Sequence, residues 1–153
     1  MIVYYDIFSG DEMVSDGFPL KETGPFLEVE CQMIPDGGSM ATGQADEMQT
    51  VVNDVVRAHR LEQTTLHKKE YVTHLRTYVK SLEKAVQERG DQDMQEWNAA
   101  MTKATKEIVD SFEDWEFYVG ESNDPNAMVV LLGMREDDTS FIRVFKDGLK
   151  TKA

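Results

Sequence analysis

The side chains that could carry chemistry in this chain are few, and they are dispersed along the sequence. There is a single cysteine, Cys31, and three histidines, His59, His67 and His74. A zinc site or a nucleophilic centre needs several such residues in a recognisable spacing, and the sequence shows no such ligand set and no Ser/His/Asp arrangement. We therefore expect no metal site at the histidines, no catalytic centre, and a buried thiol at Cys31.

Carboxylates are abundant instead. The chain has 29 Asp and Glu against 16 Lys and Arg, which gives a net charge of −13. The clusters at residues 11–16 and 136–138 and the acidic loop at about residues 35–49 offer oxygen ligands to a hard cation, but none has the spacing of a calcium-binding loop. We assign no calcium ligands, because solvated turn acids explain these clusters as well. A field of this sign repels phosphate backbones, so we expect no nucleic-acid partner.

Basic residues gather in the middle of the chain, where residues 51–89 carry eight bases and five acids. Leu66 is followed by apolar residues that recur every three or four positions from Tyr71 to Leu82, which predicts an amphipathic helix, and most of the cations fall on its other face. These cations are Lys68, Lys69, Arg76, Lys80 and Lys84. They favour an acidic partner, although a solvated helix face explains them equally well.

The predicted helix runs from about residue 67 to 89 and ends at Gly90, a residue suited to a left-handed cap. Asp91 or Asp93 can cap a second helix, whose apolar residues continue to Phe112. Because the connection is this short, we expect an antiparallel helical hairpin over about residues 66–112.

Strands surround this hairpin. Alternating or β-branched patterns predict strands at 2–8, 26–34, 115–119, 128–134 and 141–145. Residues 50–64 indicate a strand, with a short helix as the alternative. The polar stretch 9–16 is expected to interrupt the first strands, residues 35–49 to form a flexible loop, and residues 146–148 to end the sheet. Strands followed by helices and again by strands predict an α+β fold with mostly antiparallel sheets.

Length and composition indicate one domain spanning residues 1–153. No apolar run reaches the ~18 residues that a membrane span requires, and the first residues lack the basic start of a secretory signal. We expect a cytoplasmic protein.

The sequence resembles the translationally controlled tumour protein (TCTP) family over nearly its whole length. The segments that carry the resemblance are YYDIFSGDEMVSD (4–16), LEVE (27–30), FYVGES (117–122), DPNAMV (124–129), RED (135–137) and FKDGL (145–149). The resemblance implies a β-tent with a projecting α-helical hairpin. The family's flexible loop is shortened in this chain, and its glycine-rich signature there is missing.

The resemblance also implies a non-enzymatic role in growth and survival control. It places Glu12, Gly120 and Glu121 on a surface for a Ras-like small GTPase, Rheb, with exchange-factor-like activity. It implies weak calcium binding, tubulin association through the basic helix face, and apoptosis regulators as further partners. Glu12 as a solvated loop acid and Glu121 as an acceptor for turn amides are the simpler alternatives. A divergent redox enzyme on the same fold and a chaperone-like binder are the alternative functions.

Overall fold

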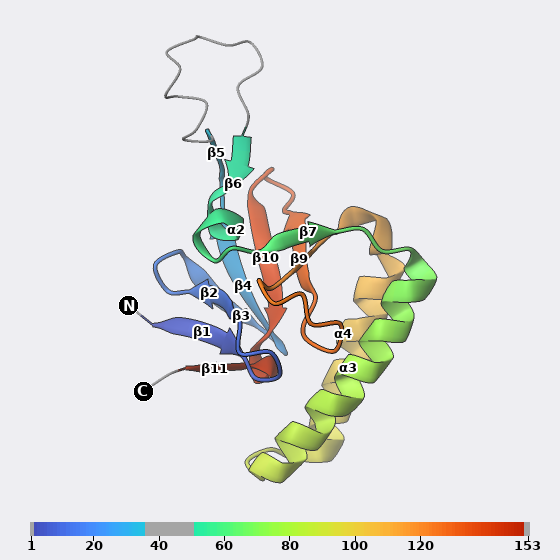
Figure 1. Ribbon diagram of the computed structural model, residues 1–153. Coiled ribbons are helices and arrows are strands. Elements are labelled where there is room, and N and C mark those ends of the chain that lie inside the picture. The colour runs from blue at the N-terminus through green and yellow to red at the C-terminus, as the bar shows by residue number, and fades with distance from the viewer. Residues whose placement is uncertain (1, 36–50, 152–153) are drawn as a thin grey trace.

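The computed structural model describes residues 2–35 and 51–151, so the loop predicted over residues 35–49 lies outside the described residues except for Pro35. Within them the chain has an α+β fold in which every strand pair is antiparallel (Figure 1). This confirms the predicted fold class.

The largest sheet has six strands and provides the largest share of the core. In spatial order its strands are β3 (Leu20–Thr23), β4 (Phe26–Cys31), β10 (Ser140–Phe145), β9 (Val130–Met134), β8 (Glu116–Val119) and β7 (Glu62–Thr64). Two smaller sheets complete the β structure. One orders β11 (Leu149–Thr151), β1 (Val3–Asp6) and β2 (Glu12–Ser15), and the other pairs β5 (Met33–Pro35) with β6 (Val51–Asn53).

The helical hairpin consists of α3 (Lys68–Arg89) and α4 (Met94–Asp110). Helix α3 ends at Gly90, whose φ of 73° is the left-handed conformation that the sequence predicted. Asp93 caps α4 by accepting hydrogen bonds from the Gln95 and Glu96 amides at 2.9 and 3.3 Å. The predicted antiparallel pair of helices is therefore confirmed.

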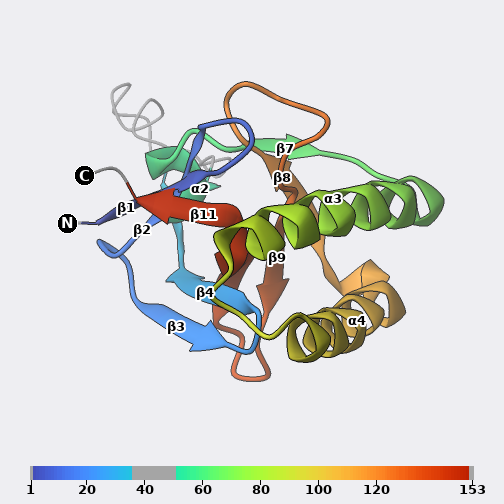
Figure 2. The ribbon, with the colours of Figure 1, turned by 90° about the horizontal axis from the view of Figure 1, so that it is seen from below.

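Each helix buries the apolar stripe that its sequence displays. The buried residues are Tyr71, Leu75, Tyr78, Leu82 and Val86 on α3, and Trp97, Met101, Ala104 and Ile108 on α4. Tyr71 packs on Phe117 of β8 and Tyr78 on Phe145 of β10, with ring centroids 4.8 and 5.5 Å apart. The hairpin thus lies along one side of the six-stranded sheet (Figure 2).

A single carboxylate fastens the interhelical turn to the sheet. Asp147 lies in the 3-10 turn Lys146–Gly148 that follows β10. Its Oδ1 accepts hydrogen bonds from Arg89 Nη2 and Gln92 Nε2, both at 3.0 Å, and its Oδ2 accepts one from Trp97 Nε1 at 2.9 Å. Both helices are therefore anchored at the end where the chain reverses.

A buried ion cluster joins three strands of the main sheet. The Glu28 carboxylate in β4, whose side chain is 6% exposed, pairs with Arg143 of β10 at 2.7 Å and with Arg135, just beyond β9, at 3.2 Å. The Arg143 guanidinium also lies over the Phe26 and Trp115 rings, 4.5 and 4.9 Å from their centroids. The two cations compensate the burial of the Glu28 carboxylate, and the two aromatic faces stabilise the Arg143 guanidinium.

The structure corrects the sequence interpretation at three places. The polar stretch 9–16 contains β2, in which Met13 and Val14 are fully buried. Residues 50–64 are not one strand, because the short helix α2 (Asp54–Ala58) separates β6 from β7. The turn at residues 146–148 ends β10 but leads into β11, which pairs with β1.

Candidate functional site

The carboxylate of Glu12 is held by a histidine from a different part of the chain. Glu12 opens β2, and His59 follows the last residue of α2. His59 Nδ1 lies 2.8 Å from Glu12 Oε2; the imidazole is 4% exposed, whereas the Glu12 side chain is 38% exposed. The ring of Phe18 packs edge-on against His59 at 5.9 Å. The carboxylate is therefore fixed in position and still open to solvent.

Asp11, the residue before Glu12, binds the turn that follows β8 and so holds this turn close to β2. The Asp11 carboxylate accepts hydrogen bonds from the Ser122 hydroxyl at 2.6 Å and the Ser122 amide at 3.2 Å. Gly120 is buried against this contact, and a Cβ added there would collide with the Asp11 and Met13 side chains. Glycine is required at this position because the two segments approach so closely.

Glu121 is the exposed acidic residue of the turn that follows β8, and it contacts the segment that contains His59. Its Oε2 lies 3.6 Å from Arg60 Nη1, and Arg60 directly follows the His59 that holds Glu12. We call the surface formed by Glu12, His59, Arg60, Gly120 and Glu121 the Glu12 surface. The three residues that the family resemblance assigned to a GTPase surface, Glu12, Gly120 and Glu121, thus lie in neighbouring segments although more than 100 positions separate the first from the others.

The five cations of the predicted basic face all lie exposed on α3. None of Lys68, Lys69, Arg76, Lys80 and Lys84 forms an ion pair with another residue that the structure describes. They line no part of the Glu12 surface, so the two candidate binding regions are separate sets of residues.

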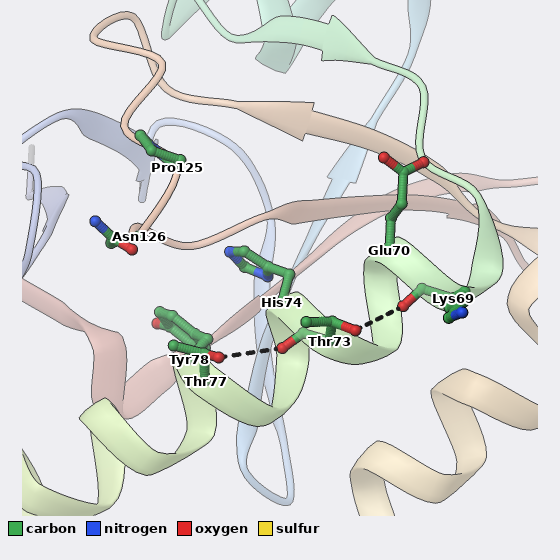
Figure 3. A pocket seen from close by; sticks show the side chains of 8 residues that line it. All are labelled: Lys69, Glu70, Thr73, His74, Thr77, Tyr78, Pro125 and Asn126. Atoms are coloured by element: carbon green, nitrogen blue, oxygen red, sulfur yellow. Dashed lines mark hydrogen bonds between the residues drawn. The ribbon is translucent and has the colours of Figure 1, made fainter.

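A cavity of about 470 Å³ opens between α3 and the turn at Pro125 and Asn126 (Figure 3). His74 projects from α3 towards this turn and donates a hydrogen bond from Nε2 to the Ala127 carbonyl at 2.9 Å. Burial lowers the pKa of His74, so its imidazole is uncharged at neutral pH. The Thr73 and Thr77 hydroxyls donate to the Lys69 and Thr73 carbonyls, so both are engaged within the helix. The cavity offers a largely apolar surface without an activated nucleophile.

Among the described residues, no three His, Cys, Asp or Glu side chains are grouped so as to hold a metal ion. The acids suggested for calcium have other partners: Asp11 binds Ser122, Glu12 binds His59, and Asp16 accepts the Ile2 amide at 2.8 Å. The acids of the turn at residues 136–138 are exposed. No calcium ligand set follows from this part of the chain.

Cys31 is buried, as the sequence predicted, with 2% of its surface exposed. The Asn53 side-chain amide donates a hydrogen bond to its Sγ at 3.1 Å. Burial raises the pKa of the Cys31 thiol, which disfavours the thiolate that nucleophilic chemistry requires. A thiol in this setting packs in the core.

Sequence reasoning missed His59, Arg60, Asp11 and Ser122, which position the Glu12 surface. Their contacts join segments 47 and 111 positions apart in the chain, and no local pattern indicates such pairings. The sequence also offered no indication of the cavity at His74, because its other wall comes from a distant turn.

Among the described residues, no helix is both long enough and apolar enough to cross a bilayer.

These features define a small α+β protein with a projecting helical hairpin, a buried ion cluster and an accessible carboxylate, that of Glu12, held by a buried histidine. A sequence model described as translationally controlled tumour protein matches residues 1–150. The translationally-controlled tumor protein homologs of Candida glabrata and Neurospora crassa are 38% and 39% identical to this chain, with 97% and 98% of both chains covered, respectively. The structure of the translationally controlled tumor-associated protein p23fyp from Schizosaccharomyces pombe superposes with a TM-score of 0.87 at 36% identity, covering 100% of this chain and 99% of the other. The chain belongs to the translationally controlled tumour protein family.

Proposed function

We propose that this protein is a non-enzymatic, cytoplasmic interaction protein of growth and survival control, and that its Glu12 surface binds a Ras-like small GTPase of the Rheb type. The observation that carries the proposal is the fixed, solvent-accessible Glu12 carboxylate, held at 2.8 Å by buried His59. A carboxylate that is already positioned loses little side-chain entropy when it meets a basic switch region. Glu121 adds a second acidic group on the same surface.

Titration calorimetry with a Rheb-type GTPase tests this role. Glu12→Gln removes the charge but keeps an oxygen that can accept the hydrogen bond from His59, so the fold is retained. We expect it to weaken binding at least tenfold. Glu22→Gln, at a side chain that is 72% exposed on β3, is the matched control and should bind as the wild type does. Equal affinities of Glu12→Gln and the wild type would remove the Glu12 surface from the proposal.

Exchange-factor-like activity on the same GTPase is part of the proposal and is measured separately, as release of a fluorescent guanine nucleotide. Binding without faster release would leave a docking role and remove the exchange activity. Apoptosis regulators are proposed as further partners without an assigned surface.

We also propose that the exposed cations of α3 associate with the acidic tails of tubulin. The support is their exposure and their lack of ion pairs with other described residues. Co-sedimentation with microtubules should decrease when Lys68, Lys69 and Lys84 are replaced together by Gln. Unchanged co-sedimentation would place tubulin association elsewhere or remove it.

Weak calcium binding is proposed at the level of the family, with no ligands assigned. Chemical-shift titration with calcium chloride should move a confined set of acidic residues. Shifts spread evenly over all exposed carboxylates would indicate a general ionic atmosphere and no site.

A further inference from the structure

The seam between the two long helices contains a groove whose apolar floor the proposed function does not use. It has a volume of about 470 Å³ and is lined only by residues of α3 and α4. Its floor consists of buried Leu75 and of Val72, Val79 and Val109, which are half-buried. No strand of the sheet contributes to it, so the groove belongs to the hairpin alone.

The valines of this floor lie at the edge of the core: Val79 and Val109 pack against the core cluster, and all three remain half-buried. Tyr71 and Tyr78 face the sheet, where they pack on Phe117 and Phe145, whereas Val72 and Val79 lie on the adjoining flank of α3. Valine is a weaker helix former than the straight-chain residues that usually occupy such flanks. Val72 and Val79 are seven residues apart, about 10.5 Å or two helical turns, and Val109 faces them from α4. An apolar strip of this length is long enough to contact two turns of a docked helix.

The rim of the groove is positively charged. Arg76 and Lys80 contribute from α3 and Lys106 from α4. None of the three pairs with an acid among the residues that the structure describes, whereas the arginines of the sheet are paired with Glu28. Three unneutralised cations around an apolar floor, in a chain of net charge −13, are complementary to an acidic amphipathic segment.

The shape of the groove favours a helical occupant. A third helix laid in the seam of two antiparallel helices places residues i, i+3 and i+7 on the floor and its flanking residues at the two rims. A second copy of this chain fits poorly, because the same groove would bring its own cations against these cations. We propose that the seam between α3 and α4 is a docking groove for an acidic amphipathic helix of a partner protein.

This inference goes beyond the proposed function. It shares Arg76 and Lys80 with the proposed tubulin surface but requires the apolar floor, which an extended polyanionic tail does not use. It is independent of the Glu12 surface. Contact with the apolar floor therefore distinguishes docking in the groove from simple charge attraction to the cations.

Two peptides test the groove on the full-length protein by titration calorimetry in physiological salt. The first is an 18-residue helix-forming peptide with leucines at positions i, i+3 and i+7 of one face and glutamates on its flanks. The second has the same composition with the leucines distributed around the helix. We expect the patterned peptide to bind at least tenfold more tightly. In NMR spectra of the protein it should also shift the amide resonances of Val72, Val79 and Val109. Equal affinities of the two peptides would overturn the inference and leave the tubulin proposal untouched.

Matched substitutions locate the binding. Lys106→Gln should weaken the patterned peptide about fivefold, whereas Lys103→Gln, the same change on the same helix outside the groove, should have less than a twofold effect. Val79→Ser should weaken the patterned peptide without changing the affinity of the shuffled one. Val79→Thr nearly preserves side-chain shape and covers the case in which Val79→Ser unfolds the protein. Equal effects of Lys103→Gln and Lys106→Gln would show that net charge alone drives binding and would overturn the groove.

Discussion

His59 and Glu12 form a hydrogen bond of 2.8 Å between His59 Nδ1 and Glu12 Oε2, across 47 positions of sequence. It joins the end of α2 to the first residue of β2. The other ring nitrogen of His59 is buried and has no hydrogen-bond partner among the described residues. Glu12 is therefore the one described side chain that satisfies this imidazole.

A double-mutant cycle with Glu12→Ala and His59→Ala should measure this contact. We expect a coupling free energy of about 1 kcal/mol, because the hydrogen bond is charge-assisted but one partner is accessible to water. Urea unfolding of the four proteins provides the measurement. Additive effects of the two substitutions would show that the contact contributes nothing to stability.

Replacing Glu28 by Gln should destabilise the main sheet strongly. The substitution leaves two partly buried guanidinium groups, those of Arg135 and Arg143, without their shared carboxylate. We expect a loss of about 3–5 kcal/mol in the free energy of unfolding. Glu22→Gln removes the same charge from an exposed pair with Lys146 at 3.8 Å and should change stability by less than about 0.5 kcal/mol. Similar losses in both variants would contradict this account of the cluster.

Asp147→Ala should loosen the hairpin from the sheet. It deprives Trp97 Nε1 of its acceptor and removes two further hydrogen bonds, from Arg89 and Gln92. We expect a loss of about 2–4 kcal/mol and faster amide hydrogen exchange at the interhelical turn. Asp91→Ala also removes a partner of Arg89, but an exposed one, and should cost less than about 1 kcal/mol. Slow exchange in Asp147→Ala would show that packing alone holds the turn.

His74 should make stability decrease in mild acid. Burial lowers its pKa in the folded protein, so below the ordinary value of about 6.5 the unfolded chain takes up a proton that the folded chain does not. The free energy of unfolding should therefore fall as the pH decreases from about 7 towards the lowered pKa.

The variant His74→Gln keeps a donor for the Ala127 carbonyl and should flatten this slope, measured by urea unfolding at several pH values. His67→Gln, at an exposed histidine just before α3, is the matched control. A pH dependence that persists in His74→Gln and disappears in His67→Gln would contradict this prediction, because it would show that His67 causes the effect.

The periodic parts of the fold were predictable from sequence because each depends on local physics. The apolar stripe of α3, the cap at Gly90 and the alternation in β4 each reflect a repeat that one segment displays by itself. Strand β2 was not predictable, because its four residues are too few to show alternation inside a polar stretch and it is stabilised by pairing with β1. Similarly, β11 forms only because β1 offers it an edge.

The candidate site, like the fold, was predictable only in part. The resemblance to a family indicated Glu12, Gly120 and Glu121, but the contacts that assemble them, through Asp11 and His59, depend on tertiary structure. The interhelical groove likewise needs the register of α3 against α4, which the sequence of neither helix determines.

The unpaired cations of the hairpin have a consequence for how the protein approaches other molecules. From residue 68 to residue 110 the chain has eight basic and eight acidic side chains, so this segment is neutral and the whole charge of −13 belongs to the remainder. Such an asymmetric distribution gives the molecule an electric dipole, which turns it during diffusion so that the hairpin leads towards a polyanion. Because the net charge of −13 still repels a polyanion, added salt screens both this repulsion and the orienting effect of the dipole, while the lifetime of a complex, set by short-range contacts, should change little.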